Sequence, residues 1–161
     1  MHKPLFHKNL SQKTLTVERM FDAPRSRVWA AWTKSELLDQ WWAPKPWKSI
    51  TKSFDFREGG AWHYGMQGPD GITAWGWAAY ESITPEQHFA LQDGFCDEAG
   101  NKDSSLPSTH WNIEFKEEGE ATRVIATLTF ASEADMEKII AMGFEEGFSM
   151  GLGNLDELLA G

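Results

Sequence analysis

Two acidic side chains, Asp93 and Glu81, are the candidates for acid–base chemistry in this sequence. Each lies on a predicted strand in step with apolar residues, Asp93 with Leu91 and Glu81 with Trp77. Because side chains alternate between the two faces of a strand, this spacing predicts that both carboxyl groups face the core. A carboxyl group in that position needs a partner or a raised pKa, which is also the condition of a catalytic acid.

Arg19 and Tyr64 would complete such a site. Arg19 faces inward by the same alternation and is a candidate partner for the two carboxylates, whereas Tyr64 offers a phenolic proton. If the chain is an enzyme, we expect its catalytic residues among Asp93, Glu81, Arg19 and Tyr64. The same spacing is also compatible with a structural ion pair, or with a β-bulge that turns a carboxyl group outward.

The sequence lacks the residue patterns of other common catalytic and binding chemistries. The five histidines have no metal-ligand spacing, and no phosphate-binding glycine loop or nucleophile elbow is present. Three histidines, His63, His88 and His110, alternate with apolar neighbours and are expected on the outer surface. Cys96, the single cysteine, has no identifiable partner and is interpreted as a bystander. We therefore expect neither a metal nor a cofactor.

Aromatic residues are unusually frequent, with nine Trp and ten Phe against two Tyr. Four tryptophans are expected to anchor two short helices in the core: Trp29, Trp32, Trp41 and Trp42. Four others lie on predicted strands: Trp62, Trp75, Trp77 and Trp111. For the second group, a plain core and the wall of a ligand cavity are both open interpretations.

Three glycines, Gly143, Gly147 and Gly151, recur every four residues in the predicted C-terminal helix. A glycine inside a helix costs about 1 kcal/mol relative to alanine, so the repeat indicates either close packing or space left for a ligand. The ligand interpretation predicts a cavity between sheet and helix. Its predicted lining is Trp62, Tyr64, Met66, Trp77, Trp111, Ile113, Ile140, Gly143, Phe144, Gly147 and Gly151.

The element order that must position these residues is strand, two short helices, six strands and a long helix. The first strand is predicted over 14–21, the helices begin near Pro24 and Ser35, and the last helix begins after Ser132. Consecutive strands with short turns favour an antiparallel sheet. We therefore predict an α+β fold, a curved seven-stranded antiparallel sheet wrapped on a long C-terminal helix. Residues 1–13 are expected to form a flexible arm and residues 14–161 a single domain.

Charge and composition exclude several classes of partner. Fifteen basic and 24 acidic residues give a formal charge of −9, which argues against nucleic acid or an anionic membrane. No apolar run approaches the roughly 20 residues of a membrane span, and no signal peptide is evident. With one cysteine, a cytoplasmic protein is expected, as a monomer or a homodimer.

Several motifs resemble a known family. The segment Arg19-x-Phe21-Asp22-Ala23-Pro24-Arg25-x-x-Val28-Trp29-x-x-Trp32-Thr33 resembles the opening of the START-like, helix-grip (SRPBCC) superfamily. The later segments Leu38-x-x-Trp41-Trp42-x-Pro44 and Asp55-Phe56-Arg57-x-Gly59-Gly60-x-Trp62 are similar to the C-terminal domain of the activator of heat-shock-protein-90 ATPase. The resemblance covers residues 14–160.

That resemblance implies a helix-grip fold with a hydrophobic cavity between the sheet and the long helix. The function it implies first is binding of a small hydrophobic molecule. The alternatives are an enzyme of the cyclase or dehydratase kind, which the superfamily contains, and a module that interacts with a chaperone. A long polar loop over 96–108 is predicted to be mobile and to border the cavity mouth.

Overall fold

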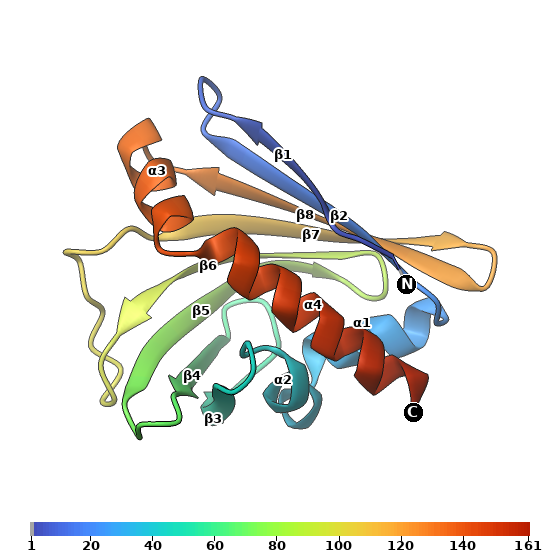
Figure 1. Cartoon of the computed structure of the whole chain (residues 1–161), viewed down its shortest axis with the longest axis horizontal. Coiled ribbons are helices and arrows are strands. Elements are labelled where there is room, and N and C mark those ends of the chain that lie inside the picture. Colours follow the sequence, from blue (N-terminus) through green and yellow to red (C-terminus); the bar gives the residue numbers. More distant parts are fainter. Residues whose placement is uncertain (1) are drawn as a thin grey trace.

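The computed structural model describes residues 2–161, which form eight strands and four helices. In chain order the elements are β1 (Leu5–Asn9), β2 (Thr14–Phe21), α1 (Arg25–Thr33), α2 (Ser35–Trp41), β3 (Lys48–Phe54), β4 (Ala61–Gln67), β5 (Thr73–Thr84), β6 (His88–Cys96), β7 (Thr109–Glu118), β8 (Ala121–Phe130), α3 (Glu133–Ala141) and α4 (Phe144–Ala160). The sheet is curved, and α4 crosses its concave face (Figure 1).

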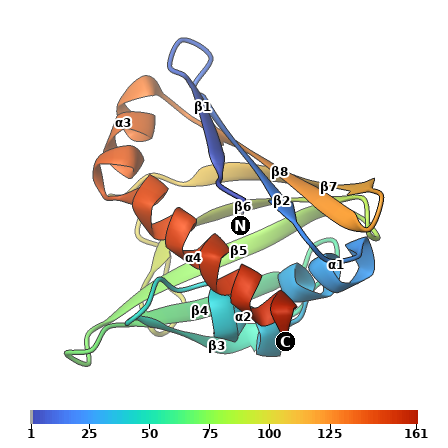
Figure 2. The ribbon, with the colours of Figure 1, turned by 45° about the vertical axis from the view of Figure 1, so that its right-hand side comes forward.

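All strands pair antiparallel in the order β1-β2-β8-β7-β6-β5-β4-β3. The segment α1–α2 connects β2, near one edge, with β3 at the other, and so it must cross one end of the concave face (Figure 2). This arrangement confirms the predicted α+β helix-grip fold. The expected count of seven strands was one too low.

The additional strand is β1, which lies inside the predicted flexible arm 1–13. It pairs with β2 from Leu5 opposite Glu18 to Asn9 opposite Thr14. Four of its five residues are exposed and only Phe6 packs against the core, so the segment has little hydrophobic alternation. An edge strand of this kind is stabilised by backbone pairing, which a hydrophobic pattern does not reveal.

The second correction concerns the C-terminal helix, which is two helices. Ser132 begins α3 as predicted, since its hydroxyl oxygen accepts a hydrogen bond of 3.0 Å from the Asp135 backbone N–H. Gly143 then interrupts the helix in the left-handed region, with φ +90°, and α4 starts at Phe144. Glycine adopts this backbone conformation without the steric cost that a Cβ brings.

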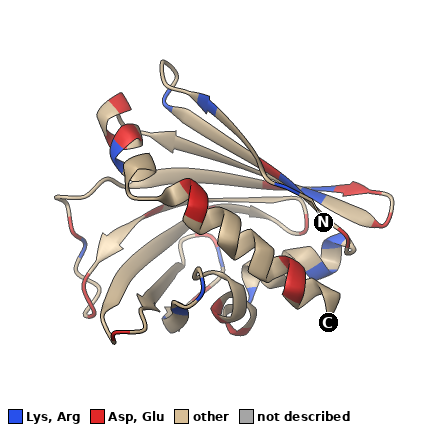
Figure 3. Ribbon diagram, viewed as in Figure 1, with Lys and Arg blue, Asp and Glu red and all other residues tan. Residues whose placement is uncertain are grey.

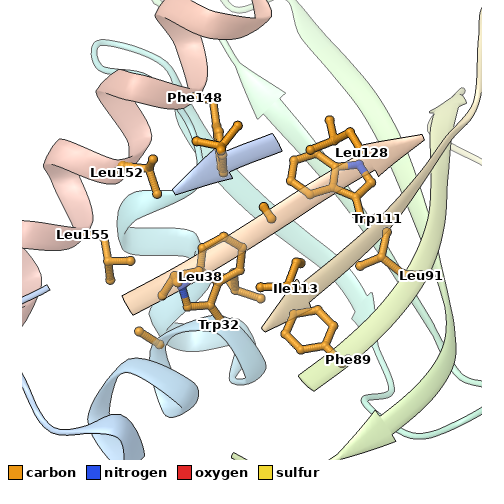
Figure 4. Packing of buried hydrophobic residues seen from close by; sticks show 14 of the residues in the cluster. Trp32, Leu38, Phe89, Leu91, Trp111, Ile113, Leu128, Phe148, Leu152 and Leu155 are labelled. Carbon is orange, nitrogen blue, oxygen red and sulfur yellow. The ribbon is translucent and has the colours of Figure 1, made fainter. Parts of the chain in front are cut away.

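The core lies between α4 and the concave face. Along β2 and β8, buried and less buried residues alternate strictly, as expected for a sheet covered on one side. On α4, the side chains of Phe148, Leu152 and Leu155 point toward the strands (Figure 4), and the ring of Phe148 packs against that of Trp111 with centroids 5.5 Å apart.

At the end of α4 near its C-terminus, α1 and α2 fill the concave face with indole rings. Trp41 is 1% exposed, and its indole N–H donates a 2.9 Å hydrogen bond to the Ala31 carbonyl oxygen. Asn154 on α4 donates to the carbonyl oxygens of Trp41 and Ala43, at 3.4 and 3.0 Å. These bonds satisfy carbonyl groups that the end of α2 leaves without helical partners.

Charged residues lie mainly at helix ends, in loops and on the outer surface, and most of α4 is uncharged (Figure 3). None of the helices within residues 2–161 is both long and apolar enough to span a membrane.

Candidate functional site

A cavity of about 150 Å³ lies between the sheet and the junction of α3 and α4. Its walls come from β4 to β8, from the loop before β7 and from both C-terminal helices. The lining residues are Tyr64, Met66, Ala74, Trp75, Gly76, Asp93, Gly94, Phe95, Pro107, Thr109, Trp111, Leu128, Ile139 and Phe144. Pro107 belongs to the polar loop that was predicted to border the cavity mouth. The mobility of that loop stays a prediction.

Small residues on β5 make room for Tyr64 at the cavity wall. Gly76 lies directly opposite Tyr64 on the neighbouring strand, and a Cβ atom at Gly76 would lie 2.9 Å from the tyrosine hydroxyl oxygen. Any side chain at Gly76 would therefore displace the ring of Tyr64. Burial raises the pKa of the Tyr64 hydroxyl, and the neighbouring Asp93 carboxyl raises it further. The group stays protonated at physiological pH.

Asp93 is the only carboxylic acid in this lining. It faces inward as predicted, because its strand partners Ala78 and Thr109 are both buried on the concave side. Burial raises the pKa of Asp93 from an ordinary value of 3.8 to about 7, and the Trp111 indole and the Thr109 backbone lower it in part. No Lys, Arg or His in the described chain forms an ion pair with it, so the predicted alternative of an ion pair is wrong for Asp93.

Two indole N–H groups near these polar atoms are left without hydrogen bonds. The Nε1 atoms of Trp111 and Trp42 are buried, and neither has a partner of normal geometry among the described residues. Trp111 lies beside Asp93, and Trp42 lies beside Tyr64. A buried donor without an acceptor costs about 1–3 kcal/mol, so each N–H can gain from a ligand or water that accepts its hydrogen bond.

Glu81 and Trp77, both predicted to face inward, lie on the opposite side of the sheet. Glu81 is exposed and lies 2.9 Å from His110 Nε2, and Lys102 stacks over Trp77 at 3.9 Å. The prediction failed because the buried side of β5 carries the smaller residues Gly76 and Ala78 as well as a tyrosine. The tryptophans of this strand, expected on the inner face, are half-buried on the outer one, although Trp75 also contributes to the cavity lining.

Arg19 is buried as predicted, but it lies in another part of the molecule. Its guanidinium group forms two hydrogen bonds with the Asp156 carboxylate on α4, at 3.1 and 2.6 Å. A third bond, of 2.6 Å, goes to the Met20 carbonyl oxygen. The bidentate pair attaches α4 to β2. Arg19 therefore has a structural partner and does not join Asp93, which corrects the predicted catalytic set.

Most of the remaining predicted ligand residues line the main cavity, a neighbouring groove or a deeper space. Met66, Trp111 and Phe144 line the main cavity and also, with Gly147, a neighbouring groove of about 170 Å³. Trp62 and Ile113 line a deeper space of about 20 Å³, which Tyr64, Asp93 and Trp111 border as well. Ile140 is half-buried against the core and lines none of these spaces.

The three helix glycines do three different things. Gly143 separates α3 from α4 and so does not belong to a helical stripe. At Gly147 an added Cβ would meet only the Pro44 side chain, at 4.0 Å, so this position leaves room in the groove. At Gly151 a Cβ would lie 3.3 and 3.4 Å from the carbonyl oxygens of Trp42 and Trp41. Close packing therefore explains Gly151.

The histidines lie on the outer side, as the alternation predicted. His63 contacts the Asp97 carbonyl oxygen at 3.2 Å, and His88 contacts the Ser82 hydroxyl at 3.3 Å. Cys96 is half-buried, and burial raises the pKa of its thiol. Residues 2–161 contain no group of three or more His, Cys, Asp or Glu side chains that could hold a metal ion.

Sequence reasoning missed the unpaired indole N–H of Trp42 and several residues of the cavity wall. The predicted lining did not include Ile139 or Pro107. The apolar spacing in α3 was a usable signal for Ile139, since Met136 lies three residues earlier on the same helix face and both are buried. Pro107 lies in the loop that was predicted to border the cavity mouth, but nothing in its local sequence distinguished it from the other loop residues.

Comparison with known proteins shows the family. Residues 22–160 match the family model described as "Activator of Hsp90 ATPase homolog 1-like protein". No match is found among functionally curated proteins.

Solved structures of similar proteins support the same family. A solution structure of a protein from Arthrobacter aurescens is 33% identical, with a TM-score of 0.92 over 97% of this chain and 91% of the other. A crystal structure from Mycobacterium smegmatis is 30% identical, with a TM-score of 0.90 over 96% and 95% of the two chains. A solution structure from Staphylococcus epidermidis is also 30% identical, with a TM-score of 0.85 over 96% and 93%. The fold, the sequence motifs and these matches all indicate the same family. The chain belongs to the Activator of Hsp90 ATPase homolog 1-like family.

Proposed function

We propose that this chain binds a small hydrophobic molecule in the cavity beneath the α3–α4 junction. The observation that carries the proposal is the makeup of the cavity wall. A space of about 150 Å³ is lined mainly by aromatic and aliphatic groups, and one carboxyl group, that of Asp93, faces it. Ligand sites in proteins are typically concave, mostly apolar and supplied with a few polar groups that fix orientation.

The volume sets the size of the ligand. An apolar cavity of roughly 150 Å³ accommodates a benzene ring. One way for a larger molecule to fit is to extend past Met66 and Phe144 into the neighbouring groove, because these residues line both spaces. The proposed ligand is therefore either a single ring or a longer apolar molecule that displaces these side chains.

Thermal unfolding with benzene, toluene and indole as probes tests the proposal. Binding at a hundredfold excess over the dissociation constant stabilises a protein by about 2.7 kcal/mol, which corresponds to a rise in Tm of about 5–10 °C for a domain of this size. Leu128→Phe is expected to abolish the shift by filling the cavity. Gly147→Leu, which fills only the groove, is the matched control and should keep it. The absence of any shift in the wild type would refute binding.

A second candidate function, an enzyme of the cyclase or dehydratase kind, is favoured by Asp93. A carboxyl group whose pKa is about 7 can take up and release a proton at neutral pH. The machinery would consist of Asp93 and Tyr64, since Glu81 and Arg19 lie elsewhere. Asp93→Asn should then keep ligand affinity and lose turnover. If turnover persists in this variant, Asp93 is not the catalytic acid; if the wild type shows no turnover, the enzyme hypothesis fails and the binding proposal is unaffected.

A further inference from the structure

We propose that the ligand is a single-ring aromatic alcohol, whose hydroxyl group lies between the carboxyl group of Asp93 and the indole N–H of Trp111. This inference rests on the proposed binding function, since it specifies the chemistry of the molecule in the same cavity.

The donor is the indole of Trp111. Trp111 is 4% exposed and lines the cavity. Its Nε1 atom has no hydrogen-bond partner among the described residues. An indole N–H can only donate, so whatever satisfies it must present an oxygen or another acceptor. The adjoining Asp93 carboxyl is near but completes no hydrogen bond of normal geometry with it. The wall of the cavity therefore contains an unsatisfied donor, which a ligand reaches when the side chains covering Nε1 move.

The acceptor is Asp93. Its carboxyl group faces the same cavity, and no basic side chain of the described chain neutralises it. Apart from Asp93, Tyr64 is the only side chain in the lining that titrates. Whether ionised or protonated, a carboxyl group keeps at least one oxygen that accepts a hydrogen bond. The cavity therefore offers an acceptor beside the donor.

A hydroxyl group matches this pair, because it both donates and accepts. It can donate to Asp93 and accept from Trp111 at the same time. A methyl group would leave the Trp111 donor unpaired, and a carboxylate would place a second negative charge beside Asp93.

The rest of the cavity favours a ring. Tyr64, Phe95, Trp111 and Phe144 present aromatic surfaces to the space, and Trp111 and Phe144 meet edge to face with centroids 5.8 Å apart. Aromatic rings pack favourably in such edge and offset arrangements. A volume of about 150 Å³ holds one ring. Together these features select a phenol over an aliphatic alcohol.

Calorimetric titration of the full chain with phenol and toluene tests the inference, because the two molecules have nearly the same shape. Trp111→Phe removes the donor and Asp93→Leu removes the acceptor. We expect each variant to lower the ratio of phenol affinity to toluene affinity about tenfold, because toluene reports any change in the shape of the cavity. Trp32→Phe is the matched control, since it removes another unpaired buried indole N–H that does not line this cavity, and it should leave phenol affinity unchanged.

Indole N–H resonances of the wild-type protein provide a readout that needs no variant. Phenol should shift the Trp111 resonance downfield, toluene should not, and Trp32 should respond to neither. If toluene binds but phenol affinity is unchanged in both variants and the Trp111 resonance does not move, the hydroxyl inference is wrong and the binding function stands. If neither molecule binds the wild type, the binding function itself fails.

Discussion

The two ends of the space beneath α4 are built from the same kinds of side chain but are filled differently. At the end covered by α1 and α2, Trp32 packs edge to face against Trp41 with centroids 4.8 Å apart. At the end beneath the α3–α4 junction, Trp111 and Phe144 also meet edge to face, yet a cavity remains beside them. Aromatic content alone therefore does not decide whether a region is solid core or binding site.

The difference comes from the elements that cover each end. The filled end has two helices whose side chains are inserted between sheet and α4, and α2 touches α4 closely at Gly151. The open end is covered by α3, whose contacts are with β8 and α4, and by the loop before β7. A turn at Gly143 separates α3 from α4, so no straight helix fills the space.

The largest expected difference between the two ends concerns aromatic truncation. Trp41→Ala should lower the free energy of unfolding by about 3–5 kcal/mol, because it deletes a fully buried ring and its hydrogen bond. Phe144→Ala should cost only about 1–2 kcal/mol, since that side chain is half-buried and already borders a cavity. Urea unfolding measures both. Equal losses would show that the open end is packed as tightly as the filled one.

Substitution of Gly147 and Gly151 on α4 should show the same difference between the two ends. Gly151→Leu should destabilise by about 1–3 kcal/mol, because its side chain would be forced against the Trp41 and Trp42 carbonyl oxygens. Gly147→Leu should be neutral or stabilise by up to about 1 kcal/mol, since leucine is the better helix former and space is available. Thermal melts of both variants are the measurement. A Gly147→Leu loss as large as that of Gly151→Leu would contradict the assignment of an open groove.

The third expected difference is a pH dependence at the open end. Folding raises the pKa of Asp93 from 3.8 to about 7, so the folded chain binds a proton that the unfolded chain has released between these values. The stability contributed by this group is complete below about pH 4 and is lost as the pH rises to about 7. Asp93→Asn should remove this loss and be more stable than the wild type by about 1–3 kcal/mol at pH 8.

Chemical denaturation of both proteins from pH 4.5 to pH 8 measures this difference. Comparing the two proteins cancels the opposite trend from carboxyl groups whose pKa is lowered, such as Asp97 and Glu118. A difference between wild type and Asp93→Asn that does not change with pH would show that Asp93 titrates normally.

Most of the fold was predictable, because it follows from local patterns. Alternation placed β2 at residues 14–21, and Ser132 was correctly predicted to begin a helix. The same alternation put Asp93, Tyr64 and Trp111 on the inner face of the sheet, where the structure has them. These predictions succeed because the period of a strand and the capping of a helix depend on neighbouring residues alone.

Other features depend on segments far apart in the chain. Arg19 was predicted to be buried, but its partner Asp156 lies 137 residues later on α4. Glu81 and Trp77 were assigned to the wrong face of β5, because alternation identifies two faces and only the packing determines which one is covered. The edge strand β1 was missed for a related reason, since its pairing with β2 is made by backbone atoms.

The sequence by itself thus determined the order of strands and helices, the family motifs and the residues that could face a core. The tertiary structure alone decided which of those residues surround empty space. A cavity is what remains after all side chains have packed, and the roles of Gly147 and Gly151 differ only because α2 touches one and not the other. Volume is a property of the whole assembly of elements, and no local pattern records it.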